Sequence, residues 1–277
     1  MKRPKDGSRR YHDRVARQYD AIYDDAYWAF HDEVTWGLLK PYLPRHQPAA
    51  CADLGCGTGK WGLRLLKSGF DVTFLDHAAA MVEQVRRKLE SPPHAARARR
   101  ATLVVGDIVH MPQLASGSFD LVVAMGDPLS ICSDPVAAVR EMARITRDGG
   151  TVCATVDNTL AAIDHYVERG NLDALEQFVQ TSRTHWLTAD ADERFPLHTF
   201  TPAGLRALFE GNGFEVLEVA GKTVLPVRQN RKLLEAPNAI DRLVALERRL
   251  GRDPASVGRC AHLQVAARRR ETGPVRP

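Results

Sequence analysis

The sequence predicts an α/β protein built on one mainly parallel sheet with helices on both faces. Over residues 49–156, short apolar stretches alternate with amphipathic stretches of about ten residues, a rhythm typical of βαβ units. The apolar stretches are hydrophobic at successive positions, as in strands buried on both faces. A glycine-rich stretch, DLGCGTG at residues 53–59, follows the first of them. This is where an open α/β sheet binds its ligand.

Composition restricts the class of protein further. A chain of 277 residues can bury a large core without disulfides. Its five cysteines are odd in number and form no CxxC pair, which argues against a disulfide framework or a zinc site. The formal net charge is only +4, and the arginine clusters lack interleaved aromatic residues, which argues against nucleic-acid binding. With no apolar leader or membrane span, we expect a soluble cytoplasmic protein.

The elements follow in order along the chain. Residues 1–10 and 269–277 are charged and lack apolar periodicity, so we expect flexible ends around one domain at 11–268. Residues 11–45 carry apolar and aromatic side chains at helical spacing and predict an N-terminal helical cap. The next segments predict strands at 49–55, 71–76, 101–107, 119–126 and 151–156, with helices at 59–69, 78–90 and 134–146.

Beyond the fifth strand the alternation is interrupted. Residues 158–198 predict a capping insertion with helices at 159–170 and 172–182. A helix at 201–214 then begins with Thr201 as N-cap and Pro202 at the first helical position. It leads into a strand at 215–221, a helix at 238–251 and a last strand at 261–269, with Asn238 expected to cap that helix and Gly251 to end it. This last helix is a candidate pocket wall or oligomer interface.

The glycine loop does not fit the common phosphate-binding motifs. A dinucleotide fingerprint requires glycine or alanine at position 60, where Lys60 stands, and a P-loop requires serine or threonine where Trp61 stands. The loop is also preceded by Asp53, whose carboxylate would repel a pyrophosphate but suits an ammonium group.

The pattern Asp53-x-Gly55-x-Gly57-x-Gly59 resembles the first motif of class I S-adenosylmethionine-dependent methyltransferases, and the likeness extends over most of the chain. The resemblance implies a Rossmann-like, doubly wound seven-strand sheet with an antiparallel last strand. It implies S-adenosylmethionine as cofactor, S-adenosylhomocysteine as product, and no metal. The amino acid part of the cofactor would lie at the glycine loop, the ribose at Asp76 and the adenine at Asp107. The implied cofactor-binding set is Tyr19, Asp53, Gly55, Cys56, Gly57, Thr58, Gly59, Asp76, His77, Met81, Asp107, Ile108, Met125 and Gly126.

Methyl transfer from a sulfonium is an in-line displacement that needs alignment, exclusion of water and, for some acceptors, a base. Asp127 follows the fourth strand and is a candidate catalytic residue, although it could simply turn the chain before Pro128. His198 in the insertion is the second candidate, because imidazole titrates near neutral pH. His165 and His185 are further histidines of the insertion, and any of the three could be a surface or packing residue.

Aromatic residues of the N-terminal cap and the insertion are candidates for the pocket. Tyr19 in VARQYD resembles the A-x-x-Y-D helix that precedes the first motif in small-molecule members of the family. The candidate substrate pocket comprises Tyr11, Tyr23, Trp28, His165 and Trp186. The alternative is that these aromatic rings bury the helical cap against the sheet.

We therefore expect methyl transfer to an O, N, S or C nucleophile of a small molecule by a monomer or homodimer. No motif identifies the acceptor atom. Three alternatives use the same fold: an RNA-modifying enzyme, a protein-modifying enzyme, and a protein that binds S-adenosylmethionine without catalysis.

Overall fold

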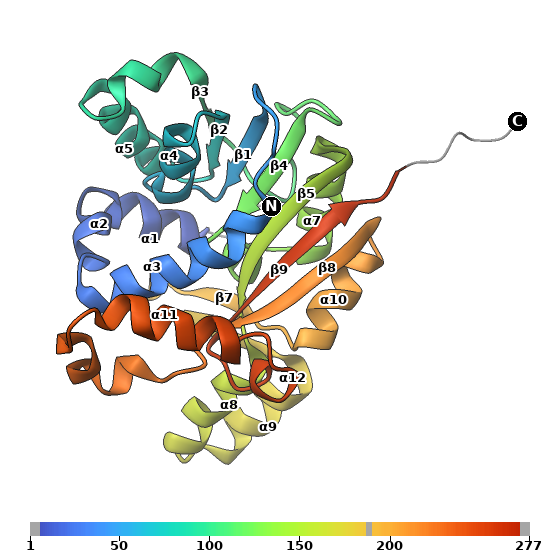
Figure 1. Ribbon diagram of the computed structural model, residues 1–277. Helices are drawn as coiled ribbons and strands as arrows, with labels where there is room; N and C mark the ends of the chain where they lie inside the picture. Colours follow the sequence, from blue (N-terminus) through green and yellow to red (C-terminus); the bar gives the residue numbers. More distant parts are fainter. Residues whose placement is uncertain (1–5, 187–189, 272–277) are drawn as a thin grey trace, which may run out of the picture.

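The computed structural model describes residues 6–186 and 190–271, and a seven-strand sheet runs through it (Figure 1). The strand order is β3-β2-β1-β4-β5-β9-β8, and β9 is antiparallel to both its neighbours. The predicted Rossmann-like sheet with an antiparallel last strand is thus confirmed. The bounds are β1 (Ala50–Leu54), β2 (Asp71–Asp76), β3 (Ala101–Val105), β4 (Phe119–Ala124), β5 (Thr146–Asp157), β8 (Phe214–Lys222) and β9 (His262–Arg269).

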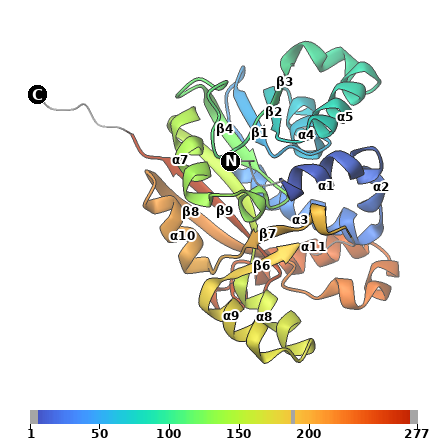
Figure 2. The same ribbon diagram turned by 180° about the vertical axis from the view of Figure 1, so that it is seen from behind.

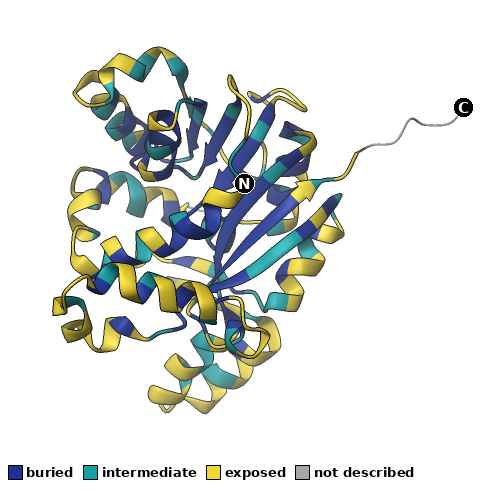
Figure 3. Cartoon of the chain, in the orientation of Figure 1, coloured by how far each residue is buried: buried dark blue, intermediate teal, exposed yellow. Residues whose placement is uncertain are grey.

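Helices cover both faces of the sheet because successive strand residues point to opposite sides. On β2, Phe74 packs in the core beneath α4 (Lys60–Lys67) and α5 (Ala79–Glu90). Its neighbour Leu75 packs in the core beneath α7 (Pro135–Ile145) and α10 (Pro202–Glu210). Figure 3 shows the sheet as the most deeply buried part of the molecule. None of the helices in the described ranges has the length and apolar composition of a membrane span.

The N-terminal segment forms α1 (Gly7–Val15), η1 (Ala16–Gln18), α2 (Tyr19–Ile22), α3 (Ala26–Leu39) and η2 (Lys40–Tyr42). The first helix begins at Gly7, before the boundary at residue 11 that the sequence suggested, and Asp6 caps it. This segment is fastened to the sheet by its own carboxylates. The side chain of Asp13 accepts a hydrogen bond from Ala80 N at the start of α5, and Asp20 accepts one from the hydroxyl of Thr58.

The insertion contains the two expected helices, α8 (Thr159–Glu168) and α9 (Leu172–Thr181), and also a hairpin that the sequence did not predict. The hairpin pairs β6 (Arg183–Trp186) with β7 (Phe195–His198). Between the two strands, η4 (Ala191–Glu193) contacts the N-terminal cap. Figure 2 shows the hairpin next to the α8–α9 pair. At the cap, both guanidinium nitrogens of Arg14 that face Glu193 donate to its carboxylate, at 2.5 and 2.6 Å.

The chain between β8 and β9 forms η5 (Val227–Gln229), η6 (Arg231–Glu235), α11 (Ala239–Leu250) and α12 (Pro254–Val257). The helix α11 lies along α3 (Figure 1), and apolar residues of the two helices share one small core. The segment therefore walls one side of the sheet's carboxyl edge, where the parallel strands end. A further short helix, α6 (Pro128–Ile131), follows β4.

The two predicted ends of α11 are correct in position but wrong in mechanism. Asn238 occupies the N-cap with a φ of 53°, and its side chain makes no capping hydrogen bond. Gly251 occupies the C-cap with a φ of −65°, so it does not supply a left-handed turn. Glycine is needed there for another reason, because a Cβ would lie 2.4 Å from the carbonyl oxygen of Gly221.

Candidate functional site

The glycine loop combines tight packing with one open position. Gly55, Gly57 and Gly59 all have positive φ values, of 63°, 53° and 88°, which favour glycine. A Cβ on Gly55 would lie 2.7 Å from the ring of Pro128, and one on Gly59 would lie 3.0 Å from Val85. At Gly57 the nearest atom would be a ring carbon of Tyr19 at 3.8 Å. The loop thus offers a backbone cradle at Gly57, beneath the ring of Tyr19.

Two carboxylates hold this loop in shape. Asp53 is fully buried, and its Oδ2 accepts from Gly62 N at 2.7 Å in the first turn of α4. Its Oδ1 has no hydrogen-bond partner among the described residues, and burial raises the pKa of Asp53 to about 7. Asp76 accepts from Gly57 N and from Ala78 N, each at 2.8 Å. Both acids position the loop, and their contacts with a cofactor remain predictions.

Three further residues of the expected cofactor set are buried near the loop. Thr58 is held by Asp20, whose other carboxylate oxygen lies 2.7 Å from Lys88 Nζ. Cys56 is buried, which raises the pKa of its thiol. Met81 is fully buried in a small cluster with α1, so it packs the cap in place and presents no surface to a ligand in this structure.

The remaining expected residues lie along the carboxyl edge of the sheet. Asp107 is exposed just after β3, and its carboxylate accepts from Val109 N. Ile108 and, after β4, Met125 are buried, whereas the ring of His77 is half-buried 5.9 Å from that of His12.

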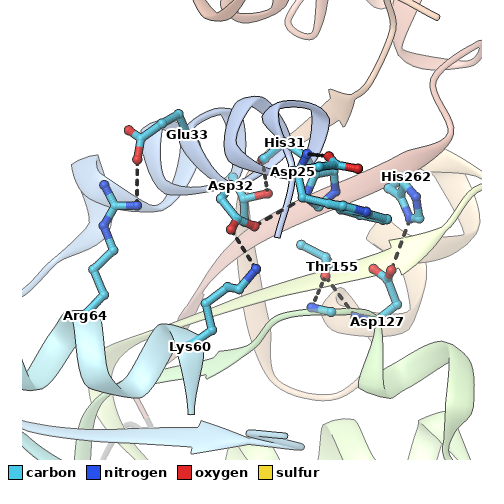
Figure 4. Close-up of polar contacts among 12 residues, drawn as sticks. Asp25, His31, Asp32, Glu33, Lys60, Arg64, Asp127, Thr155 and His262 are labelled. Atoms are coloured by element: carbon cyan, nitrogen blue, oxygen red, sulfur yellow. Dashed lines mark hydrogen bonds and ion pairs between the residues drawn. The ribbon is translucent and has the colours of Figure 1, made fainter. Parts of the chain in front are cut away.

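The end of β4 carries a strained turn. Gly126 has a φ of 84°, and a Cβ there would meet nothing within 4 Å. The next residue, Asp127, has a φ of 65°, which is rare for a residue with a side chain and must be held by its surroundings. The hydroxyl oxygen of Thr155 accepts from both backbone N–H groups, at 2.9 and 3.1 Å. The turn directs Asp127 Oδ2 to 3.1 Å from Nδ1 of His262 (Figure 4).

A row of charged side chains crosses three neighbouring strands beside this turn. His262 at the start of β9 is the register partner of Asp157 at the end of β5 and of Lys222 at the end of β8. Directly opposite residues in a sheet present their side chains on one face. His262 Nδ1 lies 3.7 Å from Asp157 Oδ1. The site therefore gathers Asp127, Asp157, His262 and Lys222 at one edge.

Asp157, His262 and Lys222 were not among the predicted site residues, although the sequence contains a signal for each. An antiparallel last strand begins at the edge where the parallel strands end, so its first residue lies at the ligand-binding edge. The predicted strands stopped one residue before Asp157 and one before Lys222. Extending each strand by one residue would have placed both side chains at this edge.

Burial and mutual charge govern the protonation of this cluster. Burial is the largest influence on His262 and lowers its pKa, but the charge and contact of Asp127 together with the charge of Asp157 outweigh burial and leave that pKa raised. Burial is also the largest influence on Asp127 and raises its pKa, but the charge and contact of His262 together with Lys222 and Thr155 leave that pKa lowered. Burial and the charge of Asp127 raise the pKa of Asp157 to about 6. Protons are therefore shared among closely spaced groups.

The same side chains also have the spacing of a metal site. One ligand atom from each of Asp127, Asp157 and His262 lies within 4.8 Å of the others. A metal ion would compete there with the proton on His262, whose pKa is raised. The buried side chain of Lys222 also interacts with both carboxylates, and its positive charge would repel a metal ion. The electrostatics favour a proton-sharing cluster.

A line of rings leads from the glycine loop to the charged cluster. Ring centroids lie 4.9 Å apart for Tyr19 and Tyr23, and 4.7 Å apart for Tyr23 and Trp28. The line continues from Trp28 to His31 at 5.2 Å and from His31 to His262 at 5.8 Å. This aromatic row forms one wall over the edge of the sheet. Figure 4 shows His31 on α3 facing the Asp127–His262 pair.

The structure does not bring the two predicted catalytic residues together. His198 hydrogen-bonds to the backbone of Cys132 and Ser133, and burial and Arg183 lower its pKa. It lines a separate open cavity of about 440 Å³ that also includes Asp134. Because the charged neighbours of Asp127 are instead His262, Lys222 and Asp157, the structure pairs Asp127 with His262.

The other predicted pocket residues are spread over the caps. Tyr11 lies 6.2 Å from the ring of Phe195 in the hairpin. His165 is exposed beside Tyr166 on α8, and His185 is exposed on β6. The backbone of Trp186 ends β6, but its side chain lies outside the described part of the chain. Of the predicted pocket set, Tyr23 and Trp28 are the residues that join the aromatic row.

Comparison with known proteins identifies the domain. Residues 51–150 match a family described as "Methyltransferase domain". Residues 51–150 carry a methyltransferase domain. Its cofactor is S-adenosylmethionine.

The methyltransferase domain is 32% identical over 133 residues to a malonyl-[acyl-carrier protein] O-methyltransferase of Yersinia pestis, covering 48% of this chain and 42% of that protein. It is 30% identical over 136 residues to the biotin biosynthesis bifunctional protein BioHC of Saccharophagus degradans, covering 49% and 22%. The chain thus spans less than half the length of these curated relatives.

Solved structures resemble the methyltransferase domain together with its caps. A methyltransferase of Haloferax volcanii, in complex with the Trm112 methyltransferase activator, has a TM-score of 0.61 at 20% identity, covering 94% of this chain and 98% of that one. A phosphoethanolamine N-methyltransferase of Haemonchus contortus has a TM-score of 0.60 at 17% identity, covering 98% and 61%. At these identities the likeness establishes the fold.

The residues present fit S-adenosylmethionine. At the carboxyl edge of the sheet, a Cβ on Gly57 or Gly126 would meet little or nothing, so the backbone is accessible at both positions. Asp76 ends β2, on the other side of β1 from β4, and contacts Gly57 N, while Oδ1 of Asp53 is an acceptor without a hydrogen-bond partner among the described residues. The fit rests on an open backbone and on carboxylates, which suit the cationic cofactor.

Proposed function

We propose that this protein transfers a methyl group from S-adenosylmethionine to a nucleophile of a small-molecule acceptor, with His262 as proton acceptor and Asp127 as its orienting partner. The observation that carries the proposal is the 3.1 Å contact between Asp127 and His262, placed directly after Gly126 at the carboxyl edge of the sheet. When bound, the cofactor supplies an electrophilic methyl group on a sulfonium.

In this proposal, backbone groups and side chains bind different parts of the cofactor. The cradle at Gly57 would receive its amino acid part, with Tyr19 above it. Asp76 would take the ribose, and Asp107 with Ile108 the adenine. Met125 and Gly126 would flank the methionine part. Because the cofactor edge is anchored through Gly57 and Asp76, alignment of the methyl group depends on backbone geometry that is already set.

The orientation of the His262 imidazole determines which of its nitrogens would accept the proton. Nδ1 of His262 faces Asp127, so Nε2 is the nitrogen left to accept a proton from the acceptor's nucleophile. The nearby carboxylate stabilises the imidazolium that results. In the described part of the chain, Nδ1 of His262 has no full hydrogen-bond partner, and catalytic contacts of this kind tighten when substrates bind.

The caps support a small acceptor. Arg14 on α1 binds Glu193 of the insertion, and Arg10 lies 3.1 Å from Asp192. The N-terminal cap and the insertion are thus joined by ion pairs, and in this proposal the two joined segments limit access to the carboxyl edge. A structural relative of the same fold was solved with phosphomonomethylethanolamine and S-adenosylhomocysteine bound.

The deciding experiment compares two histidines. We expect His262→Gln to lower kcat about 10²- to 10⁴-fold, because a general base contributes that much, while the Kd for S-adenosylhomocysteine stays within about threefold. His198→Gln is the matched control and should retain turnover. Turnover is measured as S-adenosylhomocysteine released with pools of small metabolites, and affinity by calorimetry.

Two outcomes would contradict the proposal. Equal losses in both histidine variants would remove the special role of His262. Turnover confined to RNA or protein pools would replace the small-molecule acceptor with a macromolecular one.

A further inference from the structure

Lys222 is a buried lysine whose side-chain nitrogen the fold itself does not pair, and burial lowers its pKa. It ends β8, is 1% exposed and ranks among the largest fully buried side chains. Among the described residues, its ammonium makes no hydrogen bond and no ion pair within 4.0 Å, and carboxylates act on it only at longer range. Burying an ammonium without a close partner costs free energy. A bound anion would supply the opposite charge and offset this cost.

The carboxylates nearest to Lys222 are already engaged. Asp32 binds Lys60 at 2.7 Å, and Asp127 lies 3.1 Å from His262 (Figure 4). Asp157 lies 3.7 Å from the same imidazole. None of them moves close to Lys222 without giving up its present partner.

The charge of Lys222 acts on the same space as the proposed base. Burial and the charge of Lys222 lower the pKa of His31, the ring that joins the aromatic row to His262. Lys222 is also the register partner of His262 on the neighbouring strand. On the far side of this space, a Cβ at Gly126 would meet nothing within 4 Å. The ammonium therefore lies beside the place where the acceptor's nucleophile must approach His262.

A second cation stands on the same wall. Arg228 on η5 is exposed. It is close enough to Tyr23 and Tyr27 for its charge to lower their pKa values, although burial is the larger influence and leaves both raised. The end of β8 and the segment that follows it thus place one buried and one exposed basic side chain near the aromatic row. The carboxylates of the cluster lie after β4 (Asp127) and at the end of β5 (Asp157).

We propose that Lys222 binds an anionic group, a carboxylate or a phosphate, of the methyl acceptor. The proposal rests on the function proposed above and narrows it to small acceptors that carry an anion. The Cα atoms of register partners in a sheet lie about 5 Å apart, so Lys222 and His262 are close enough to contact one small molecule. The cost of desolvating the ammonium is met on folding, so the site is prepared for the anion before it arrives.

The test uses protein saturated with S-adenosylhomocysteine, with inorganic phosphate and malonate as separate probes in calorimetric titrations. We expect wild-type protein to bind one of the two, which distinguishes phosphate from carboxylate recognition. Lys222→Met should weaken that binding at least tenfold, whereas Lys222→Arg should keep it within about threefold because the charge remains. Lys232→Met, which removes an exposed lysine of η6, is the matched control and should bind as wild type does.

Thermal unfolding of the same variants separates binding from folding. Methionine has a volume similar to that of lysine and needs no partner, so Lys222→Met should melt at or above the Tm of wild type. Equal probe binding by wild type and Lys222→Met, or no binding of either probe by wild type, would overturn the anion site. Failure of wild type to bind S-adenosylhomocysteine would instead overturn the proposed function.

Discussion

The two halves of the sheet's carboxyl edge are built in different ways. One half lies after β1 and β2, where we propose that the cofactor binds; this cofactor half is formed by one short stretch between Asp53 and Met81, and its shape is set mainly by backbone geometry. The other half, where we propose that the acceptor binds, is assembled from Asp127, Asp157, Lys222 and His262, which are far apart in the sequence and meet largely through strand register; it is the acceptor half. The first half is a local motif, whereas the second exists only in the folded chain.

The halves also differ in how their charged groups are paired, although each contains one buried carboxylate oxygen without a hydrogen-bond partner among the described residues, Oδ1 of Asp53 and Oδ1 of Asp127. In the cofactor half, Asp76 accepts from two backbone N–H groups at 2.8 Å and holds the loop rigidly. In the acceptor half, Asp127 is held in a strained conformation with a buried, unpartnered Oδ1, and Lys222 lacks a close counter-charge. Strain and unsatisfied charge concentrate at functional sites because the substrate completes them.

The strongest way to test the cofactor half is to fill its cradle. We expect Gly57→Arg to abolish S-adenosylhomocysteine binding, because its φ is 53° and the side chain would occupy the space beneath Tyr19. Asp76→Ala should also abolish binding, since it removes the acceptor for Gly57 N together with the expected ribose contact. Calorimetry measures both.

The matched control for the loop is Gly170→Ala. Gly170 also has a positive φ, of 63°, and open space around its Cβ position, but it lies between α8 and α9. It should bind S-adenosylhomocysteine like wild type. Unchanged affinity in both Gly57→Arg and Asp76→Ala would remove the cofactor site from this half of the edge.

The acceptor half is tested by a change that leaves the cofactor half intact. We expect Asp127→Asn to lower kcat about 10²- to 10⁴-fold with little change in S-adenosylhomocysteine affinity. The pH profile adds a second signature. His262 must be neutral to accept a proton, so kcat falls as the pH drops through its raised pKa. Without the charge of Asp127, burial lowers that pKa, and the acidic limb should move to lower pH.

A neighbouring aspartate provides the control for this profile. Asp134 caps α7 through its side chain and follows the same strand, and Asn is an equally good capping residue. Asp134→Asn should therefore leave kcat and the acidic limb unchanged. An acidic limb that stays in place in Asp127→Asn would show that Asp127 does not set the protonation of His262.

The sequence alone indicated the cofactor half, because its features are properties of short stretches of the chain. These features are the backbone conformation at three closely spaced glycines, the apolar strands and a carboxylate after β2. They predicted the α/β sheet and carried the family resemblance that implied S-adenosylmethionine as cofactor. His262 was missed because its position depends on the direction of β9 and on pairing with β5, more than a hundred residues away. His198 was preferred for its residue type alone.

The hairpin β6–β7 was missed for a related reason. Its strands have four residues each, and β7 contains Pro196, which weakens any strand prediction. It is held in part by contacts with a distant segment, including the ring of Tyr11 against Phe195. Short elements that depend on tertiary contacts leave little periodicity to read.

The smallest expected effect concerns the contact that holds the two caps together over both halves. The side chain of Arg14 is 53% exposed, whereas that of Glu193 is 6% exposed, so removing the arginine leaves a nearly buried carboxylate without its main partner. We expect Arg14→Gln to raise the Kd for S-adenosylhomocysteine about two- to fivefold, the range of a partly exposed ion pair. High salt screens such pairs, so the difference from wild type should shrink near 1 M salt. Arg206→Gln breaks a pair within α10 and should leave the Kd unchanged. A lower Tm with unchanged affinity in Arg14→Gln would mean that the contact stabilises the caps without closing them over the cofactor.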